Sequence, residues 1–302
     1  MPTRAPQRPS PRSLSGFLDT ASPEALFILS AVAQYVGATI AVLLFDEVAP
    51  QTVAWFRVIG ASIAVLAVSR AFWRGWTRRE LAAAAIFGIA TAAMNTFFYL
   101  AIDRTDLGKS VAIEFIGPIA VAAATTRSAR NAAALVLAVI GVVVLGGAEL
   151  DGNAAGIAYL LAASGCWAAY IVVGSRVAQD RPGVSGLGVG LAIGAVALTP
   201  FGAPGSGPVW SSPRLLLACL VVGVFSNAIG YGIDQHVLRR IPVRRFSVLL
   251  ALLPVTAVLM GWLVLDQRPS ALDLAGISLV LAGVVLQERD ELRAEIEAPD
   301  PA

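Results

Sequence analysis

The chain has 302 residues, of which 57% are hydrophobic and only 14% are charged, whereas a soluble domain carries roughly 25% charged residues. The formal net charge of +2 is small and the basic residues are scattered, which argues against a nucleic-acid-binding protein. One histidine and two separate cysteines cannot build a zinc site or a disulfide framework. This composition is typical of a protein embedded in a lipid membrane, and we expect it to hold no metal and no cofactor.

The first 23 residues are polar and rich in proline. They contain Arg4, Arg8 and Arg12 together with five prolines, a composition typical of disorder. The apolar run that follows extends over about 20 residues, which is too long for the hydrophobic region of a typical signal peptide. We therefore expect residues 1–23 to form a disordered cytoplasmic tail, followed by a retained first transmembrane helix.

Apolar runs of the length needed to cross a hydrocarbon core of about 30 Å follow one another along the chain. Short separators rich in Arg, Asp, Pro and Gly divide them. The sequence thus predicts an all-α polytopic membrane protein with ten transmembrane helices. The predicted spans are residues 25–45, 50–69, 80–102, 107–126, 131–148, 154–176, 184–201, 213–237, 243–265 and 271–287.

The distribution of basic residues orients these spans. With a cytoplasmic N-terminus, 17 of the 22 lysines and arginines fall in inner segments and four in outer loops, as the positive-inside rule requires. Both termini are then cytoplasmic, and residues 288–302 form a charged cytoplasmic tail. Arginine outnumbers lysine 21 to 1, which is typical of a GC-rich bacterium, so we expect a multi-pass protein of a bacterial inner membrane.

The sequence also contains an internal repeat. Shifting residues 99–118 by 136 positions aligns them with residues 235–254 and places Pro118 on Pro254. A unit of five spans is odd, so the second unit must be inverted relative to the first, an arrangement found in transporter folds whose substrate site lies between the repeats. The predicted repeats cover residues 24–148 and residues 154–287.

Three ionisable residues inside predicted spans stand out, Arg57, Glu114 and Asp234, because a charge there costs roughly 3 kcal/mol or more and indicates a functional site. Arg57 and Glu114 each lie seven residues from the outer end of their span, at a depth of about 10 Å. Either they form a structural ion pair, or Glu114 contacts a cationic substrate group or carries a coupling proton. In the second case Arg57 holds a carboxylate or tunes Glu114. Glu114 aligns with Leu250 in the repeat, and this asymmetry favours a site role.

Asp234 and His236 lie near the inner end of the eighth predicted span. Asp234 can reach the membrane interface or pair with Arg239 or Arg240, which needs no function. The alternative is an inner gate or proton relay, because histidine titrates near neutral pH.

Uncharged polar and aromatic residues follow single helical faces. An asparagine in a span usually bonds across helices, so these residues are either packing contacts or the lining of a polar cavity. The candidates for substrate binding are Asn95, Tyr99, Trp167, Tyr170, Asn227 and Tyr231, and Gln34 and Tyr35 lie together in the first span.

Two prolines fall near the middle of predicted spans. Pro118 and Pro254 each free a backbone carbonyl one turn earlier, which leaves either a plain kink or an irregular segment able to bind a ligand or to act as a hinge. Gly117, directly before the first proline, completes the predicted hinge.

Residues 88–122 end one span with Asn-x-x-Phe-Tyr-Leu and continue, after a polar turn, into Ala-x-Glu-Phe-x-Gly-Pro. This pattern resembles the EamA-type drug/metabolite transporters, most closely their threonine/homoserine exporter branch, and GCWAAYIVVGSR at residues 165–176 resembles the start of the family's second half. One departure is Leu253–Pro254, where the family commonly has Glu-Pro, and this shifts weight onto Glu114. The residues that match the first-half pattern are Asn95, Tyr99, Glu114, Phe115, Gly117 and Pro118.

The resemblance implies two EamA repeats, a central cavity, alternating access and the export of small amino acids or related metabolites, coupled to protons. The chain has no GxxxxGK[ST] loop, which favours an ion gradient over ATP as the energy source. The alternatives are a lipid or lipid-linked intermediate flippase and a multidrug exporter on the same fold; an enzyme is disfavoured because no HExxH or GxSxG motif is present. The expected partners are a small-molecule substrate, protons and membrane lipid, and the expected oligomeric state is a monomer or homodimer.

Overall fold

The computed structural model describes residues 20–69, 75–125, 129–147, 153–180, 185–238, 240, 249 and 252–297. These residues form helices, and no strand occurs among them, as expected of an all-α membrane protein. The predicted disordered tail lies almost entirely outside the described residues. The helices are α2 (Pro23–Leu44), α3 (Pro50–Ser69), α4 (Arg78–Ile102), α5 (Leu107–Glu114), α6 (Ile116–Thr125), α7 (Ala129–Gly147), α8 (Ala154–Asp180), α9 (Ser185–Gly202), α10 (Gly207–Ser211), α11 (Pro213–Gly223), the π-helix η2 (Val224–Ile229), α12 (Gly230–Leu238), α14 (Leu252–Leu265) and α15 (Ala271–Glu297).

Local sequence explains where several helices begin. Ser22 accepts a hydrogen bond from the Ala25 amide and is followed by a proline, which is favoured in the first turn of a helix. Thr77 and Glu80 form a reciprocal capping box at the start of α4. Such caps satisfy backbone amides that would otherwise have no partner at the membrane surface.

Within the described ranges, five helices are long and apolar enough to cross a membrane. Their surroundings agree with that role, because large side chains such as Val68, Val196 and Leu263 expose 82%, 73% and 72% of their area. An apolar surface of this kind is stable in lipid and costly in water. The protein is therefore a polytopic membrane protein. The five helices are Pro23–Leu44, Pro50–Ser69, Arg78–Ile102, Ala154–Val172 and Pro213–Asp234, and the shorter apolar helices are Ala132–Leu145, Gly186–Gly202, Leu252–Leu265 and Ala271–Leu286.

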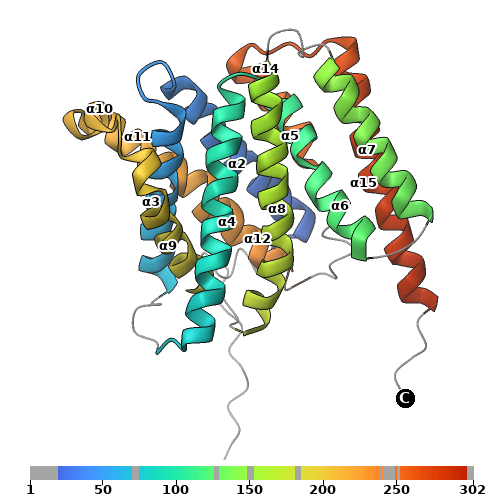
Figure 1. The fold of residues 1–302 in the computed structure, drawn as a ribbon, viewed down its shortest axis with the longest axis horizontal. Helices are drawn as coiled ribbons and strands as arrows, with labels where there is room; N and C mark the ends of the chain where they lie inside the picture. The colour runs from blue at the N-terminus through green and yellow to red at the C-terminus, as the bar shows by residue number, and fades with distance from the viewer. Residues whose placement is uncertain are drawn as a thin grey trace, which may run out of the picture.

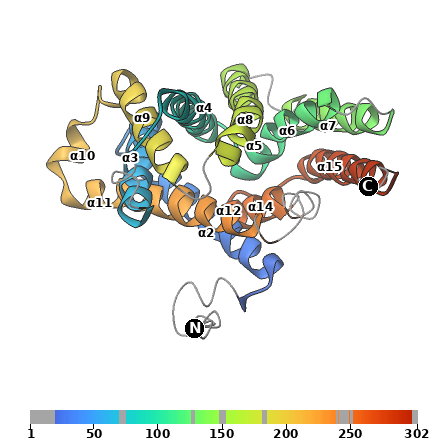
Figure 2. The same ribbon diagram turned by 90° about the horizontal axis from the view of Figure 1, so that it is seen from below.

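The long helices stand side by side as a bundle (Figure 1). Seen from below, α4, α8 and α7 lie along one side, and α11, α12 and α15 lie along the other (Figure 2). Helices from the first half of the chain pack against helices from the second half. Thus α8 packs on α4, α9 on both α3 and α4, α12 and α14 on α2, and α15 on α7.

Glycines allow several of these helices to approach closely. A Cβ atom at Gly223 of α11 would collide with the carbonyl oxygen of Arg57 on α3, and one at Gly88 of α4 would collide with that of Gly190 on α9. Small residues are enriched in such contacts because they let two backbones meet within a membrane. The approach of α11 to α3 positions the site described below.

Two predicted spans are interrupted. The span expected over residues 107–126 divides into α5 and α6 at Phe115, three residues before Pro118. Proline has no amide hydrogen to donate to the carbonyl of Glu114, so the α-helix breaks there. The span expected over residues 213–237 passes through the π-helix η2. In addition, α15 continues to Glu297, so most of the predicted C-terminal tail is helical.

Candidate functional site

Arg57 on α3 is the centre of a buried polar cluster and exposes only 5% of its surface. Its Nε atom donates a hydrogen bond of 2.6 Å to Oδ1 of Asn227 in η2. Its guanidinium carbon lies 4.8 Å from the centre of the Tyr99 ring on α4, within the range of a cation–π contact. The cluster thus joins the consecutive helices α3 and α4 to η2, which is distant in sequence. We call Arg57, Tyr99 and Asn227 the donor cluster.

Each member of the donor cluster has a buried hydrogen-bond donor without a partner. Within the part of the chain that the structure describes, these donors are Nη1 of Arg57, the hydroxyl of Tyr99, which lies close to Arg57 and Ser226 without hydrogen-bond geometry, and Nδ2 of Asn227. An unsatisfied buried polar group costs about 1–3 kcal/mol, and such groups are rare in native structures. The three donors therefore form a ready site for an acceptor, and the positive charge of Arg57 favours an anionic one.

Glu114 is the last residue of α5 and exposes 8% of its surface. The break at Phe115 leaves it at the end of a helix, and the Phe115 ring packs edge-to-face on Trp167 of α8 at 4.9 Å. The Arg57 charge acts on Glu114 electrostatically. No ion pair between Arg57 and Glu114 is found among the described residues, and the hydrogen bond of the Arg57 side chain goes to Asn227 instead.

A second carboxylate inside the helix bundle, partly buried, belongs to Asp234 on α12. Its Oδ1 lies 2.5 Å from Oγ of Ser30, and its Oδ2 accepts a hydrogen bond of 3.1 Å from Nε2 of Gln34. Both partners are on α2, and we call these three residues the Asp234 cluster. The side-chain partners of Asp234 in the described structure are Ser30 and Gln34 rather than Arg240, whose guanidinium donates to the Ala21 carbonyl; Arg239 lies outside the described residues.

Two tyrosines lie within electrostatic range of both carboxylates. Tyr35 on α2 is buried and feels the charges of both Glu114 and Asp234. Tyr231 on α12 likewise feels both, and its ring lies 6.5 Å from that of Tyr170 on α8. The sequence placed Tyr170 and Tyr231 among the candidate site residues but not Tyr35 or Ser30. Tyr35 lies beside Gln34, and Ser30 lies one helical turn before Gln34 on the same face.

Asn95 is buried on α4, but its Nδ2 donates to the carbonyl of Thr91 in the same helix at 2.8 Å. The expected contact across helices is therefore absent for its amide nitrogen, whereas Asn227 makes such a contact. His236 lies partly exposed two residues after Asp234.

The hinge candidates lie close to helix starts. Gly117 allows α6 to approach α8, since a Cβ atom there would collide with the Ser164 carbonyl oxygen. Pro118 is the third residue of α6 and Pro254 is the third residue of α14. Residues 250–251, where the second break was expected, lie outside the described part.

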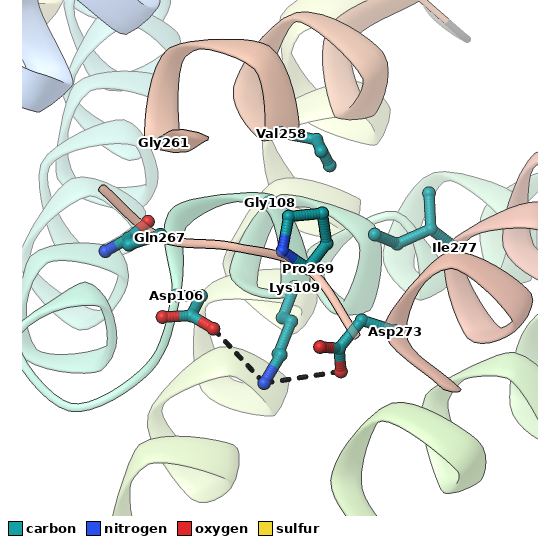
Figure 3. Close-up of a pocket in the computed structure, with 9 residues that line it drawn as sticks. All are labelled: Asp106, Gly108, Lys109, Val258, Gly261, Gln267, Pro269, Asp273 and Ile277. Atoms are coloured by element: carbon teal, nitrogen blue, oxygen red, sulfur yellow. Dashed lines mark ion pairs between the residues drawn. The ribbon is translucent and has the colours of Figure 1, made fainter. Parts of the chain in front are cut away.

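A small pocket lies where the start of α5 meets the end of α14 and the start of α15 (Figure 3). Lys109 bridges Asp106 at 3.2 Å and Asp273 at 3.3 Å, and Gln267 accepts a hydrogen bond from the Leu107 amide. The pocket volume of about 20 Å³ is enough for a single water molecule and far too small for a metabolite. We therefore interpret this feature as a contact that joins α5 to α15.

The fold is that of a polytopic helical membrane protein with a buried polar cluster, and comparison with known proteins relates it to transporters. Residues 154–287 match the EamA-like transporter family. The chain is 29% identical to the threonine/homoserine exporter RhtA of Salmonella typhimurium (strain SL1344) over 249 residues, which cover 82% of this chain and 84% of the exporter. It is 28% identical, with the same coverage, to the exporter of that name from Escherichia coli (strain K12).

These matches confirm the resemblance to EamA-type transporters and support a position near the threonine/homoserine exporter branch. They support a membrane exporter of the drug/metabolite type, and the relatives are named as exporters rather than enzymes. A solved crystal structure, described only as that of a protein, aligns with a TM-score of 0.62 at 15% identity over 91% of this chain and 99% of that one. That likeness concerns the fold alone.

Proposed function

We propose that the protein is a secondary active transporter that exports small zwitterionic amino acids of the threonine/homoserine type. The observation that carries the proposal is the donor cluster, which holds three buried donors without an acceptor and whose Arg57 acts electrostatically on the carboxylate of Glu114. A free amino acid offers a carboxylate to the donors and an ammonium to Glu114. Both buried charges then gain a partner, which offsets the cost of removing them from water.

The site is formed by helices from both parts of the chain. Arg57, Tyr99 and Glu114 come from α3, α4 and α5, while Asn227 comes from η2. In the transport cycle that we propose, the two repeats move relative to each other and expose this site to one side of the membrane at a time. The break at Phe115, the prolines at positions 118 and 254 and the π-helix η2 supply the hinges.

The proposed topology has ten spans in two inverted repeats, residues 24–148 and 154–287, with both termini in the cytoplasm of a bacterium. Asp46 and Gly75 are both exposed and lie on either side of α3 in the chain. In a variant without native cysteines, an impermeant maleimide added outside intact cells labels Asp46→Cys and not Gly75→Cys. Labelling of Gly75→Cys alone would show that the orientation of α3 is opposite to the one proposed.

Charge favours an amino acid over a lipid substrate. Arg57 and Glu114 together offer one positive and one negative group, and the aromatic side chains Trp167, Tyr170 and Tyr231 lie around them. A small zwitterion matches both charges, whereas a lipid needs long apolar walls. The energy source that we propose is the proton gradient.

Counterflow of labelled threonine in proteoliposomes tests the role of Glu114. Glu114→Gln keeps the shape of the side chain but removes the charge that holds the ammonium, so we expect it to abolish counterflow. Glu47→Gln is the matched control, because Glu47 is exposed and pairs with Arg214 at the surface. Counterflow by Glu114→Gln at the wild-type rate would show that the proposed role is wrong.

A further inference from the structure

The Asp234 cluster has no role in binding the amino acid in the proposal above. Asp234 lies seven residues after Asn227 in the chain, on α12 rather than in η2, and no hydrogen bond between the two clusters is found among the described residues. Within the described part of the chain its hydrogen-bond partners are Ser30 and Gln34, both uncharged. A carboxyl group placed in a membrane helix without a cation beside it is costly when ionised.

The number of available protons allows two hydrogen-bond arrangements in this cluster, one for each protonation state of Asp234. Oγ of Ser30 lies 2.5 Å from Oδ1 of Asp234 and 2.9 Å from the Gly230 carbonyl oxygen, and it accepts a hydrogen bond of 3.1 Å from Gln34. The serine hydroxyl has a single hydrogen, and a carbonyl oxygen can only accept. When Asp234 is ionised, Ser30 donates to the carboxylate and the contact with Gly230 has no proton. When Asp234 is protonated, it donates to Ser30, and Ser30 donates to Gly230.

We propose that Asp234 is the proton-binding residue of the transport cycle, with Ser30 as a hydroxyl that reverses its donation when the proton binds. This inference rests on the proposed function and assigns separate tasks to the two carboxyls inside the helix bundle: Glu114 binds the ammonium of the substrate and Asp234 binds the coupling proton. The proton adds to the carboxylate on one side of the membrane and leaves the same oxygen on the other.

The groups around Asp234 fit this assignment. The charge of Asp234 acts electrostatically on Tyr35 of α2, Tyr170 of α8 and Tyr231 of α12, and all three are phenols. His236 is two residues further along α12 and therefore on the opposite face of the helix. Neither η2 nor α14, which also pack on α2, contains a titratable side chain.

Two paths connect proton binding with substrate binding. The first is the chain itself, because η2 holds Asn227 and continues directly into α12, which holds Asp234. The second is Tyr35, which feels the charges of both carboxyls. A change in hydrogen bonding between α2 and α12 can therefore alter the donor cluster through the continuous segment η2–α12 and through Tyr35.

The test uses the full chain in proteoliposomes and two measurements, exchange of labelled threonine and threonine-dependent proton movement followed with a pH-sensitive dye. We expect Asp234→Asn to lose proton movement and accumulation driven by a pH gradient while exchange persists. Asp266→Asn is the control, since Asp266 is exposed and lies in the turn after α14. Threonine-dependent proton movement by Asp234→Asn at the wild-type level would overturn the inference.

A second variant covers the case in which Asp234→Asn does not fold. Ser30→Ala removes the hydroxyl that donates to the ionised carboxylate, so we expect the pH profile of proton movement to shift to higher pH. An unshifted profile would also overturn the inference.

Failure of the wild-type protein to exchange threonine at all would instead contradict the proposed function, so the two failures are distinguishable. Loss of both activities in Asp234→Asn, with the protein folded, would place Asp234 in substrate binding and contradict the assignment of tasks.

Discussion

Arg57 is held in place by its shape as well as its charge. The Nε–H bond to Asn227 and the contact with the Tyr99 ring both require a planar guanidinium, and together they leave Nη1 directed at no protein acceptor. Lysine is not equivalent, because it is a point charge on a flexible stem and has no second donor in a fixed plane. The side chain is therefore positioned before the substrate arrives, which reduces the entropy lost on binding.

This geometry predicts the effect of Arg57→Lys. The variant keeps the positive charge but loses the bond to Asn227 and the fixed orientation. A hydrogen bond to a charged group contributes about 1.5–3 kcal/mol. We therefore expect threonine binding to weaken by about tenfold or more, since 1.4 kcal/mol corresponds to a factor of ten. Binding of labelled threonine to the purified protein measures this change.

Arg214→Lys is the control for this prediction, because Arg214 is exposed and pairs only at the surface with Glu47. An affinity of Arg57→Lys equal to that of the wild type would show that the guanidinium does not hold the substrate. A loss of folding is detected separately by size-exclusion chromatography.

Sequence reasoning finds some residues of the site more readily than others. Arg57 and Glu114 stand out because a charge in an apolar span is costly and rare. Ser30 does not, because serine is common in membrane helices and has a special meaning here only through Asp234, which is 204 positions away. The partner of Arg57 could not be predicted either, because the choice between Glu114 and Asn227 depends on how η2 packs against α3.

At the scale of the elements, the contact between α11 and α3 determines whether Asn227 reaches Arg57. A Cβ atom at Gly223 would collide with the Arg57 carbonyl oxygen and would lie 2.8 Å from the Ala61 amide nitrogen. The opposing atoms belong to a helix backbone and cannot move as a flexible side chain can. The glycine is therefore required by the packing of these two helices.

We expect Gly223→Ala to destabilise the protein by about 1–3 kcal/mol, the usual cost of overpacking, and to lower its apparent Tm in detergent. Gly232→Ala is the matched control, because nothing lies within 4 Å of a Cβ atom at that helical position. The control substitution should leave the Tm unchanged or raise it slightly. Equal Tm values for both variants would contradict the proposed close packing.

The two interrupted spans differ in how far the sequence predicts them. The break at Phe115 follows from Pro118, whose missing amide hydrogen is visible in the sequence. The π-helix η2 has no proline and no glycine among its residues Val224–Ile229. It is a product of tertiary packing, in which Ser226 and Asn227 turn towards α2 and α3, and π-helices of this kind often occur at functional sites.

At the scale of the whole molecule, apolar composition and long runs of hydrophobic residues are sufficient to predict a polytopic helical membrane protein. Composition does not predict which helices pack together. The pairing of α4 with α8 and of α7 with α15 joins residues far apart in the chain. The ten-span topology and its two inverted repeats remain proposals that the labelling experiment tests.

The central claim is that both charged ends of a free amino acid are bound, the carboxylate by the donor cluster and the ammonium by Glu114. The most direct test is competition against counterflow of labelled threonine in proteoliposomes, with unlabelled threonine, threonine methyl ester and N-acetylthreonine as competitors. The ester lacks the carboxylate and the acetyl derivative lacks the ammonium. The account predicts that only free threonine competes. Competition by either blocked derivative as strong as that by threonine would contradict it.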